Sequence, residues 1–482
     1  MSLSTPFFLF LFLPVCLAFF HAAPKRARMA ALLVLSLCFY ALADPSHLPV
    51  LLLAVLANHA AVRAIGRAPQ GPGRARRLAL GVGMNLLLLA GYKYLPFFVK
   101  ILEDLGALPP GTAAGPFFAD WTLPLGVSFF TFAAISRLAD AAGRTDPPGE
   151  SLAAFTLFLA FFPKILAGPI ARHGDIREDL AGPSPTLQGA ALGVRRLCAG
   201  LAKKALIAQP LGVFADAIFS AAPKGLDAPS AWLGLASYSL QIYYDFSGYT
   251  DMAIGLGLLF GVRLPENFNA PYLSRSVREF WRRWHITLSA WFRDYLYIPL
   301  GGSRNGPLKT YRNLLIVFVL CGLWHGAGWP FLVWGLWHGM FLCLERLFAG
   351  RIVDRAPRIF GHVYGLLAVC LGWVFFRAPD FSTAWSMFCA LVPLGGGAPG
   401  WYAGTYATRE VLAAMAAGVV CCGAFNAPLA GLWVRARGAS SGRDGQGPGA
   451  RLAANCGALL LFLLAVLAMA AAGQESFIYA RF

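Results

Sequence analysis

Runs of apolar residues recur along the chain and constrain its fold more than any other feature. The first extends from Phe7 to Phe20. Later runs cover about 29–43, 47–62, 78–99, 122–136, 151–171, 188–220, 229–262, 286–300, 311–345, 358–376, 383–394, 409–434 and 452–472. A helix that crosses a bilayer needs about 20 mostly apolar residues, and several runs are shorter or longer than that. The sequence therefore predicts an all-α polytopic membrane protein with about 11 to 13 transmembrane or re-entrant helices.

Composition excludes a set of soluble domains. Of the 482 residues, 58% are hydrophobic and 13% are charged, whereas soluble proteins carry about 25% charged residues. No polar stretch exceeds about 30 residues, which is too short for an independent soluble domain. We therefore expect residues 1–482 to form a single integral-membrane domain, with any active site inside it.

The charge balance is strongly basic, and the position of the cations explains most of it. The chain has 40 Lys and Arg against 23 Asp and Glu, a formal net charge of +17. Loops 24–28 and 63–77 are basic, whereas 44–46 and 100–121 carry mostly acidic residues. The positive-inside rule places the basic loops in the cytoplasm and makes the first run an uncleaved anchor with its N-terminus outside. The cations thus predict contact with membrane lipids and no nucleic-acid partner.

Two carboxylates, Asp245 and Asp251, lie in an otherwise apolar and aromatic stretch. Polar groups at membrane depth are costly and are functional candidates by default. The two residues are six positions apart, and six steps of about 100° turn the second side chain by about 240° from the first on a helix. They therefore lie on different helix faces and do not form an acid/base pair with each other. Either each is bonded to a Tyr, a Ser or a helix N-terminus and braces the bundle, or both contribute to substrate binding.

Residues 276–289 read as one amphipathic helix at the membrane interface. Helical spacing gathers four large apolar side chains on one face: Trp281, Trp284, Leu288 and Trp291. The cations on the other faces are Arg278, Arg282 and Arg283. These arginines either anchor the helix to lipid headgroups or attract an anionic acyl donor. His285, which follows Trp284, is a candidate for catalysis.

His325 lies in the middle of a long apolar run, in the sequence Gly322-Leu-Trp-His-Gly326. Small neighbours let a substrate or another helix approach its imidazole, and burial favours the neutral ring that a general base needs. A second Trp-His-Gly follows at His338, which we interpret as structural. The sequence has no serine or cysteine in the elbow motif of a covalent nucleophile. It also has no histidines and cysteines at metal-ligand spacing. The sequence therefore predicts direct transfer without a metal.

In its motifs the chain resembles the membrane-bound O-acyltransferase (MBOAT) family, in particular the AlgI-like branch associated with alginate O-acetylation. The matching motifs are spread over the chain: Phe8–Pro14, Gly91–Tyr94, Leu123–Phe132, Phe161–Ile170, Gly200–Lys204, Tyr244–Asp251, Asn267–Tyr272, Phe280–His285, Phe292–Gly302, Gly322–Gly326 and Gly372–Arg377. The resemblance makes His325 the catalytic histidine and His285 a second polar group that positions or polarises. Asn267 and Trp324 join the arginines and aspartates as candidates for substrate or donor binding.

The resemblance also implies a helical shell around a tunnel in a bacterial inner membrane. The donor, acetyl-CoA or another acyl thioester, would enter as a co-substrate from the cytoplasm, and no cofactor would be bound. The acceptor would be an exported polysaccharide, reached through a periplasmic SGNH-type acetyl-transfer protein and the exopolysaccharide machinery.

Two other functions remain open at this stage. One is D-alanyl transfer to teichoic acid from a carrier-protein thioester, as in the DltB-like branch. The other is a transporter or flippase in which the His and Asp side chains relay protons, although the sequence has no internal repeat of the kind such proteins contain.

Overall fold

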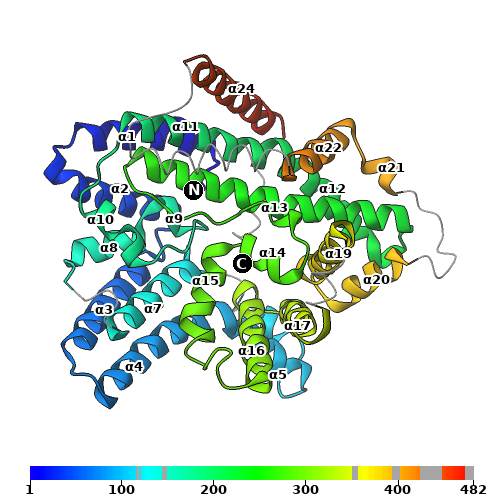
Figure 1. Cartoon of the computed structure of the whole chain (residues 1–482), viewed down its shortest axis with the longest axis horizontal. Coiled ribbons are helices and arrows are strands. Elements are labelled where there is room, and N and C mark those ends of the chain that lie inside the picture. Colours follow the sequence, from blue (N-terminus) through cyan, green and yellow to red (C-terminus); the bar gives the residue numbers. More distant parts are fainter. Residues whose placement is uncertain are drawn as a thin grey trace. The chain divides into compact units, whose positions relative to one another are not determined.

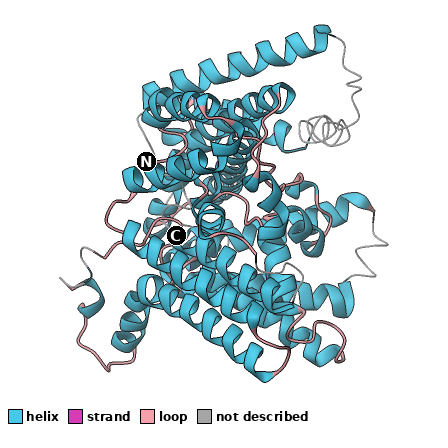
Figure 2. Ribbon diagram, turned by 90° about the vertical axis from the view of Figure 1, so that its left-hand side faces the viewer, coloured by secondary structure: helices cyan, strands magenta, loops and turns pink. Residues whose placement is uncertain are grey.

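The structure, a computed structural model, describes residues 1–115, 118, 121–143, 149–349, 357–392, 402–423 and 448–472. Within these ranges every regular element is a helix, as Figure 2 shows, so the predicted all-α class is confirmed. The chain divides into two compact units. Unit 1 comprises Met1–Val194 and Met252–Pro265, and unit 2 comprises Arg195–Asp251 and Glu266–Phe482. The single-domain organisation stays a prediction.

Seven helices of the described ranges are long and apolar enough to cross a membrane. They are Lys25–Ala43, Leu48–Arg67, Pro72–Asp104, Leu187–Ala221, Trp329–Phe348, Arg358–Arg377 and Arg451–Ala471. Phe8–Ala22 and Phe381–Leu391 are shorter apolar helices. The apolar runs seen in the sequence are therefore divided between long spans and shorter pieces, as expected of a multi-pass membrane protein with re-entrant segments.

Unit 1 is built mainly from the N-terminal helices. Their bounds are η1 Phe8–Phe12, α1 Leu13–Ala22, η2 Lys25–Ala27, α2 Arg28–Ala43, α3 Leu48–Arg67, α4 Pro72–Leu89, η3 Ala90–Tyr94, α5 Leu95–Asp104, η4 Thr112–Ala114, α7 Val127–Gly143, α8 Leu152–Ala160, α9 Phe162–Ile165 and α10 His173–Ala181. The buried amides of Asn58 and Asn85 bond to each other at 3.1 and 2.7 Å and tie α3 to α4. Such reciprocal bonds satisfy polar groups that would otherwise be costly in an apolar bundle.

Unit 2 contains most of the second half of the chain, and α11 and α13 contribute residues to both units. The bounds are α11 Leu187–Ala202, η5 Lys203–Ala208, α12 Gln209–Ala221, η6 Ala222–Lys224, α13 Ala228–Leu259, η7 Pro271–Leu273, α14 Val277–Arg283, α15 Ile286–Phe292, η8 Arg293–Tyr297, α16 Pro307–His325, α17 Trp329–Leu344, η9 Glu345–Ala349, α19 Arg358–Arg377, α20 Phe381–Leu391, α21 Tyr402–Tyr406, α22 Arg409–Gly423 and α24 Pro448–Ala472.

Helices α16 and α17 form a closely packed pair (Figure 1). Glycine at two positions allows this approach. A Cβ at Gly322 would lie 2.2 Å from the Phe331 carbonyl oxygen, and one at Gly335 would lie 2.2 Å from that of Phe318. Either contact is far inside van der Waals distance, so a larger residue would push the helices apart. The close pair holds His325 at the C-terminal end of α16.

The single helix predicted over residues 276–289 is wrong, because the segment forms two short helices, α14 and α15. The break is at His285, whose φ of 42° and ψ of 54° lie in the left-handed region that residues other than glycine rarely adopt. Ser276 caps α14 by accepting a hydrogen bond from the Glu279 N–H at 3.0 Å. The break turns His285 into a buried side chain at the start of α15.

Candidate active site

His325 is enclosed by aromatic side chains from three helices. Its ring centroid lies 4.8 Å from that of Trp324 on α16, 5.0 Å from Trp334 on α17 and 5.2 Å from Phe376 on α19. All three neighbours meet the imidazole roughly edge to face, and the residue is 1% exposed. This aromatic packing fixes the ring and excludes water, a setting in which a neutral imidazole is favoured.

Of the two uses expected for the small residues beside His325, the structure shows the close approach of another helix. A Cβ at Gly326 would lie 2.2 Å from the Phe331 ring. The space that the missing side chain leaves is thus filled by Phe331 of α17, which in turn meets Phe376 edge to face at 5.2 Å. Gly326 therefore helps to close the aromatic wall around the histidine.

His285 is held by hydrogen bonds rather than by aromatic packing alone. It is fully buried, and its Nδ1 lies 3.0 Å from the Oδ1 of Asn267. The Phe246 ring packs edge-on against the imidazole at 4.7 Å. Burial lowers the pKa of His285 to about 3, so the ring is neutral at physiological pH. Asn267, predicted from the sequence as a site residue, is thus in direct contact with one of the two histidines.

Trp324 is the common neighbour of the two histidines. Its ring centroid lies 6.0 Å from that of His285 and 4.8 Å from that of His325. The structure therefore brings four of the predicted site residues into one connected cluster: His325, Trp324, His285 and Asn267.

His338, one turn after Trp334, lies on the same aromatic wall. The indole N–H of Trp281 donates to its Nδ1 at 3.4 Å, and Trp334 packs against it at 5.1 Å. These contacts join α14 to α17. They suit the structural role expected of His338.

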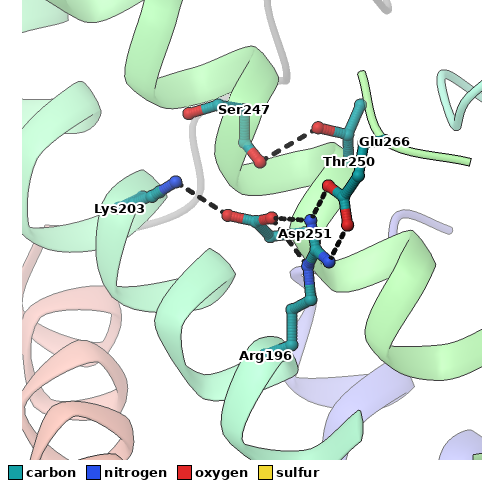
Figure 3. A network of polar contacts seen from close by, with 6 residues as sticks. All are labelled: Arg196, Lys203, Ser247, Thr250, Asp251 and Glu266. Atoms are coloured by element: carbon teal, nitrogen blue, oxygen red, sulfur yellow. Dashed lines mark hydrogen bonds and ion pairs between the residues drawn. The ribbon is translucent and has the colours of Figure 1, made fainter. Parts of the chain in front are cut away.

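The two predicted aspartates are bonded to cations, as Figure 3 shows for Asp251. Asp251 accepts hydrogen bonds from Arg196 at 2.9 Å and from Lys203 at 2.7 Å, and Arg196 also forms a two-pronged ion pair with Glu266. Asp245 pairs with Lys204 at 2.6 Å. For Asp251 the structure shows cations in place of the Tyr, Ser or helix N-terminus expected from the sequence. The partners come from α11 and η5, and the aspartates brace the bundle through ion pairs.

The three predicted arginines differ in what they contact. Arg283 forms an i,i+4 ion pair with Glu279 at 2.8 Å. The backbone N–H groups of Val277 and Arg278 donate to the Glu345 carboxylate at 2.6 and 3.0 Å. The side chains of Arg278 and Arg282 are exposed. The ion pair of Arg283 is with Glu279 and includes neither histidine.

Sequence reasoning missed the charged partners Arg196, Lys203, Lys204, Glu266 and Glu345. A signal for the first three was available, because their positive charges lie inside the apolar run 188–220. A cation in an apolar span needs a carboxylate partner, and the nearest stretch with the same mismatch is the one that contains Asp245 and Asp251. Glu345 gave no comparable signal, because it caps a helix that begins 68 residues earlier.

The fold and the cluster around His325 agree with the family match. Residues 121–385, more than half of the chain, match the model of the MBOAT, membrane-bound O-acyltransferase family. The chain belongs to this family, and it is a multi-pass membrane O-acyltransferase.

Three relatives differ in their identity to this chain and in the length over which they match it. The chain is 41% identical over 403 residues to a probable alginate O-acetylase AlgI of Azotobacter vinelandii, covering 82% of this chain and 79% of the relative. It is 36% identical over 428 residues to a peptidoglycan O-acetyltransferase of Helicobacter pylori, covering 82% and 80%. With a teichoic acid D-alanyltransferase of Bacillus subtilis the identity is 28% over 234 residues, 46% of this chain and 59% of the relative.

Proposed function

We propose that the protein transfers acetyl groups from a cytoplasmic acyl thioester to an exported, alginate-like polysaccharide. The observation that carries the proposal is the fully enclosed His325 within the matched region, in a chain similar to alginate O-acetylases over most of its length. Acetyl-CoA or another thioester is the co-substrate. A periplasmic SGNH-type protein receives the acetyl group and passes it to the polymer. The protein lies in the inner membrane with its N-terminus in the periplasm.

The chemistry requires a single base. A nitrogen of neutral His325 takes the proton of the acceptor hydroxyl as the hydroxyl oxygen attacks the thioester carbonyl carbon. The carbon–oxygen bond forms, the carbon–sulfur bond breaks, and the proton passes from the imidazolium to the leaving thiolate. The products are an ester and a free thiol. The aromatic wall keeps water, the competing nucleophile, away from the thioester.

The proposal is tested by acetylation of the exported polymer in cells that carry His325→Ala. We expect acetylation to be abolished while the variant still accumulates in the membrane at the wild-type level. The matched control is His21→Ala, since His21 is an exposed histidine of α1. Undiminished acetylation by His325→Ala would contradict the proposal.

D-alanyl transfer to teichoic acid is the second candidate, favoured by the similarity to the Bacillus subtilis enzyme. That match covers less of the chain and has lower identity than the match to the alginate O-acetylase. Purified protein offered either acetyl-CoA or a D-alanyl carrier-protein thioester distinguishes the two. Transfer from the carrier protein alone would favour the second candidate, whereas uptake of an unmodified substrate into vesicles without a donor would favour a transporter.

A further inference from the structure

The side-chain oxygen of Asn267 faces three hydrogen-bond donors. It lies 3.0 Å from His285 Nδ1, 3.2 Å from the backbone nitrogen of Thr287 and 2.9 Å from the Thr287 hydroxyl. A backbone N–H can only donate, so the atom that meets it must be the carbonyl oxygen of the amide and not its NH₂ group. This contact fixes the orientation of the Asn267 amide independently of the histidine.

An amide oxygen only accepts, so the His285 nitrogen that faces it must carry a hydrogen. A neutral imidazole has a single N–H, and the ring is fully buried. The Asn267 amide and the rings of Phe246 and Trp324, which contact it, have no ionisable group that could stabilise an imidazolium. The proton therefore resides on Nδ1, and Nε2 carries the lone pair. Within the described residues, Nε2 has no hydrogen-bond partner.

The backbone around the two residues is fixed from both sides. The Ile286 N–H donates to the Asn267 carbonyl oxygen, and the Asn269 N–H donates to that of Arg283, both at 2.9 Å. Glu266, the residue before Asn267, is held by its ion pair with Arg196. These contacts support the left-handed conformation of His285, which a residue adopts only when its surroundings stabilise it.

We propose that Asn267 is a positioning residue that fixes His285 as its Nδ1–H tautomer, so that Nε2 presents a lone pair that accepts a hydrogen bond from bound substrate and has no N–H to give to the thioester carbonyl. This inference rests on the proposed function. The opposite tautomer would present an N–H and would polarise the thioester carbonyl instead. Of the two roles expected for His285, positioning and polarising, the geometry selects positioning, because Nε2 has no N–H with which to polarise the carbonyl.

The tautomer is tested by nitrogen NMR of full-length protein labelled with ¹⁵N-histidine and reconstituted in lipid. The His285 signals are assigned by their loss in His285→Gln. We expect a protonated Nδ1 and an unprotonated Nε2 in the wild type. A protonated Nε2, with or without a protonated Nδ1, would overturn the inference. The spectrum needs no turnover, so the result stands apart from the success or failure of the proposed function.

Kinetics of acyl transfer test the positioning role. Asn267→Leu keeps the side-chain size but removes the acceptor, and we expect kcat to fall about 10- to 100-fold with KM for the donor unchanged, as when a partner that orients a histidine is lost. The matched control is Asn269→Leu, an exposed asparagine of the same loop, which should retain wild-type kcat. A wild-type kcat in Asn267→Leu, or an equal loss in both variants, would contradict the inference.

Asn267→Asp gives a second readout that does not depend on the stability of the leucine variant. Its carboxylate keeps an acceptor for Nδ1 but adds a negative charge that favours the imidazolium, which raises the pKa of His285. As pH falls, a larger fraction of His285 is then protonated on Nε2 and loses its acceptor. The titration of the His285 nitrogen signals, read separately from those of His325, should therefore move to higher pH than in the wild type. An unchanged titration of the His285 signals would contradict the contact on which the assigned role rests.

Discussion

The two histidines of the cluster are held in different ways. His325 is enclosed by the rings of Trp324, Trp334 and Phe376, which come from three helices. His285 is aimed by a hydrogen bond from a loop, at a strained position between two short helices. Aromatic packing excludes water and fixes the plane of a ring, whereas a hydrogen bond also decides which nitrogen carries the proton. The difference suggests a base at His325 and an oriented acceptor at His285.

The largest effect should come from removing the histidines. We expect His325→Ala to lower kcat by about 10²- to 10⁴-fold, the usual contribution of a general base, and His285→Ala to lower it less. Because the two residues act in the same chemical step, the double variant should be no slower than His325→Ala, as is usual when residues act as a unit. The measurement is the acyl-transfer rate of the four purified proteins. Losses that multiply in the double variant would show that the histidines act independently.

The next largest effect, on stability, should come from the ion pairs of Arg196, which hold Glu266 beside Asn267. Replacing Arg196 by Met leaves Glu266 and Asp251 without one cation, and removing one partner of a buried pair costs roughly 3 to 5 kcal/mol. The side chain of Glu266 is 32% exposed, so we expect a loss at the lower end of that range. Thermal unfolding in detergent measures it. Lys203→Met, which leaves the Arg196 pairs intact, serves as the comparison and should destabilise less; equal losses would contradict the central place of Arg196.

The surroundings of His325 should be sensitive to the packing of α16 against α17. Gly335→Ala places a methyl group against the Phe318 carbonyl oxygen, and overpacking of this kind costs about 1 to 3 kcal/mol. We expect lower thermal stability and lower kcat, while the His285 nitrogen signals stay as in the wild type. Gly457→Ala, in α24 where no atom lies within 4 Å of the added Cβ, is the control. A shift of the His285 signals in Gly335→Ala would show that the two sites are not separately held.

The smallest effect on stability should come from the three arginines of α14. Arg283→Gln removes an i,i+4 pair, which contributes about 0.2 to 0.5 kcal/mol. If the three arginines attract the donor, KM for acetyl-CoA should rise in Arg282→Gln and become less dependent on salt. Unchanged KM and salt dependence in Arg278→Gln, Arg282→Gln and Arg283→Gln would leave these residues as headgroup anchors only.

Much of this arrangement could be predicted from the sequence, because it depends on local patterns. The apolar runs indicated the helices, and His325 stood out as a polar group in an apolar run beside small residues. The all-α class, the membrane location and the family were correct for this reason. The Glu279–Arg283 pair was also predictable, since it needs only helical spacing.

The break at His285 could not be read from local patterns. The sequence from 276 to 289 has good helical periodicity, and nothing in it requires a left-handed residue. The break is stabilised by a loop 18 residues earlier, through Asn267. The cations that hold Asp245 and Asp251 likewise come from 41 to 55 residues away. Contacts with residues distant in the sequence therefore determine the break at His285 and the ion pairs of the two aspartates.

The central claim is that His325 is the base of a direct acyl transfer. Its most direct test is single-turnover transfer of labelled acetyl from bound thioester to acceptor, by wild-type protein and by His325→Ala in lipid. We expect the wild type to pass the label straight to the acceptor, and His325→Ala to bind the donor with unchanged affinity but transfer no label. Transfer at the wild-type rate by His325→Ala, or label that first appears on the protein, would contradict the account.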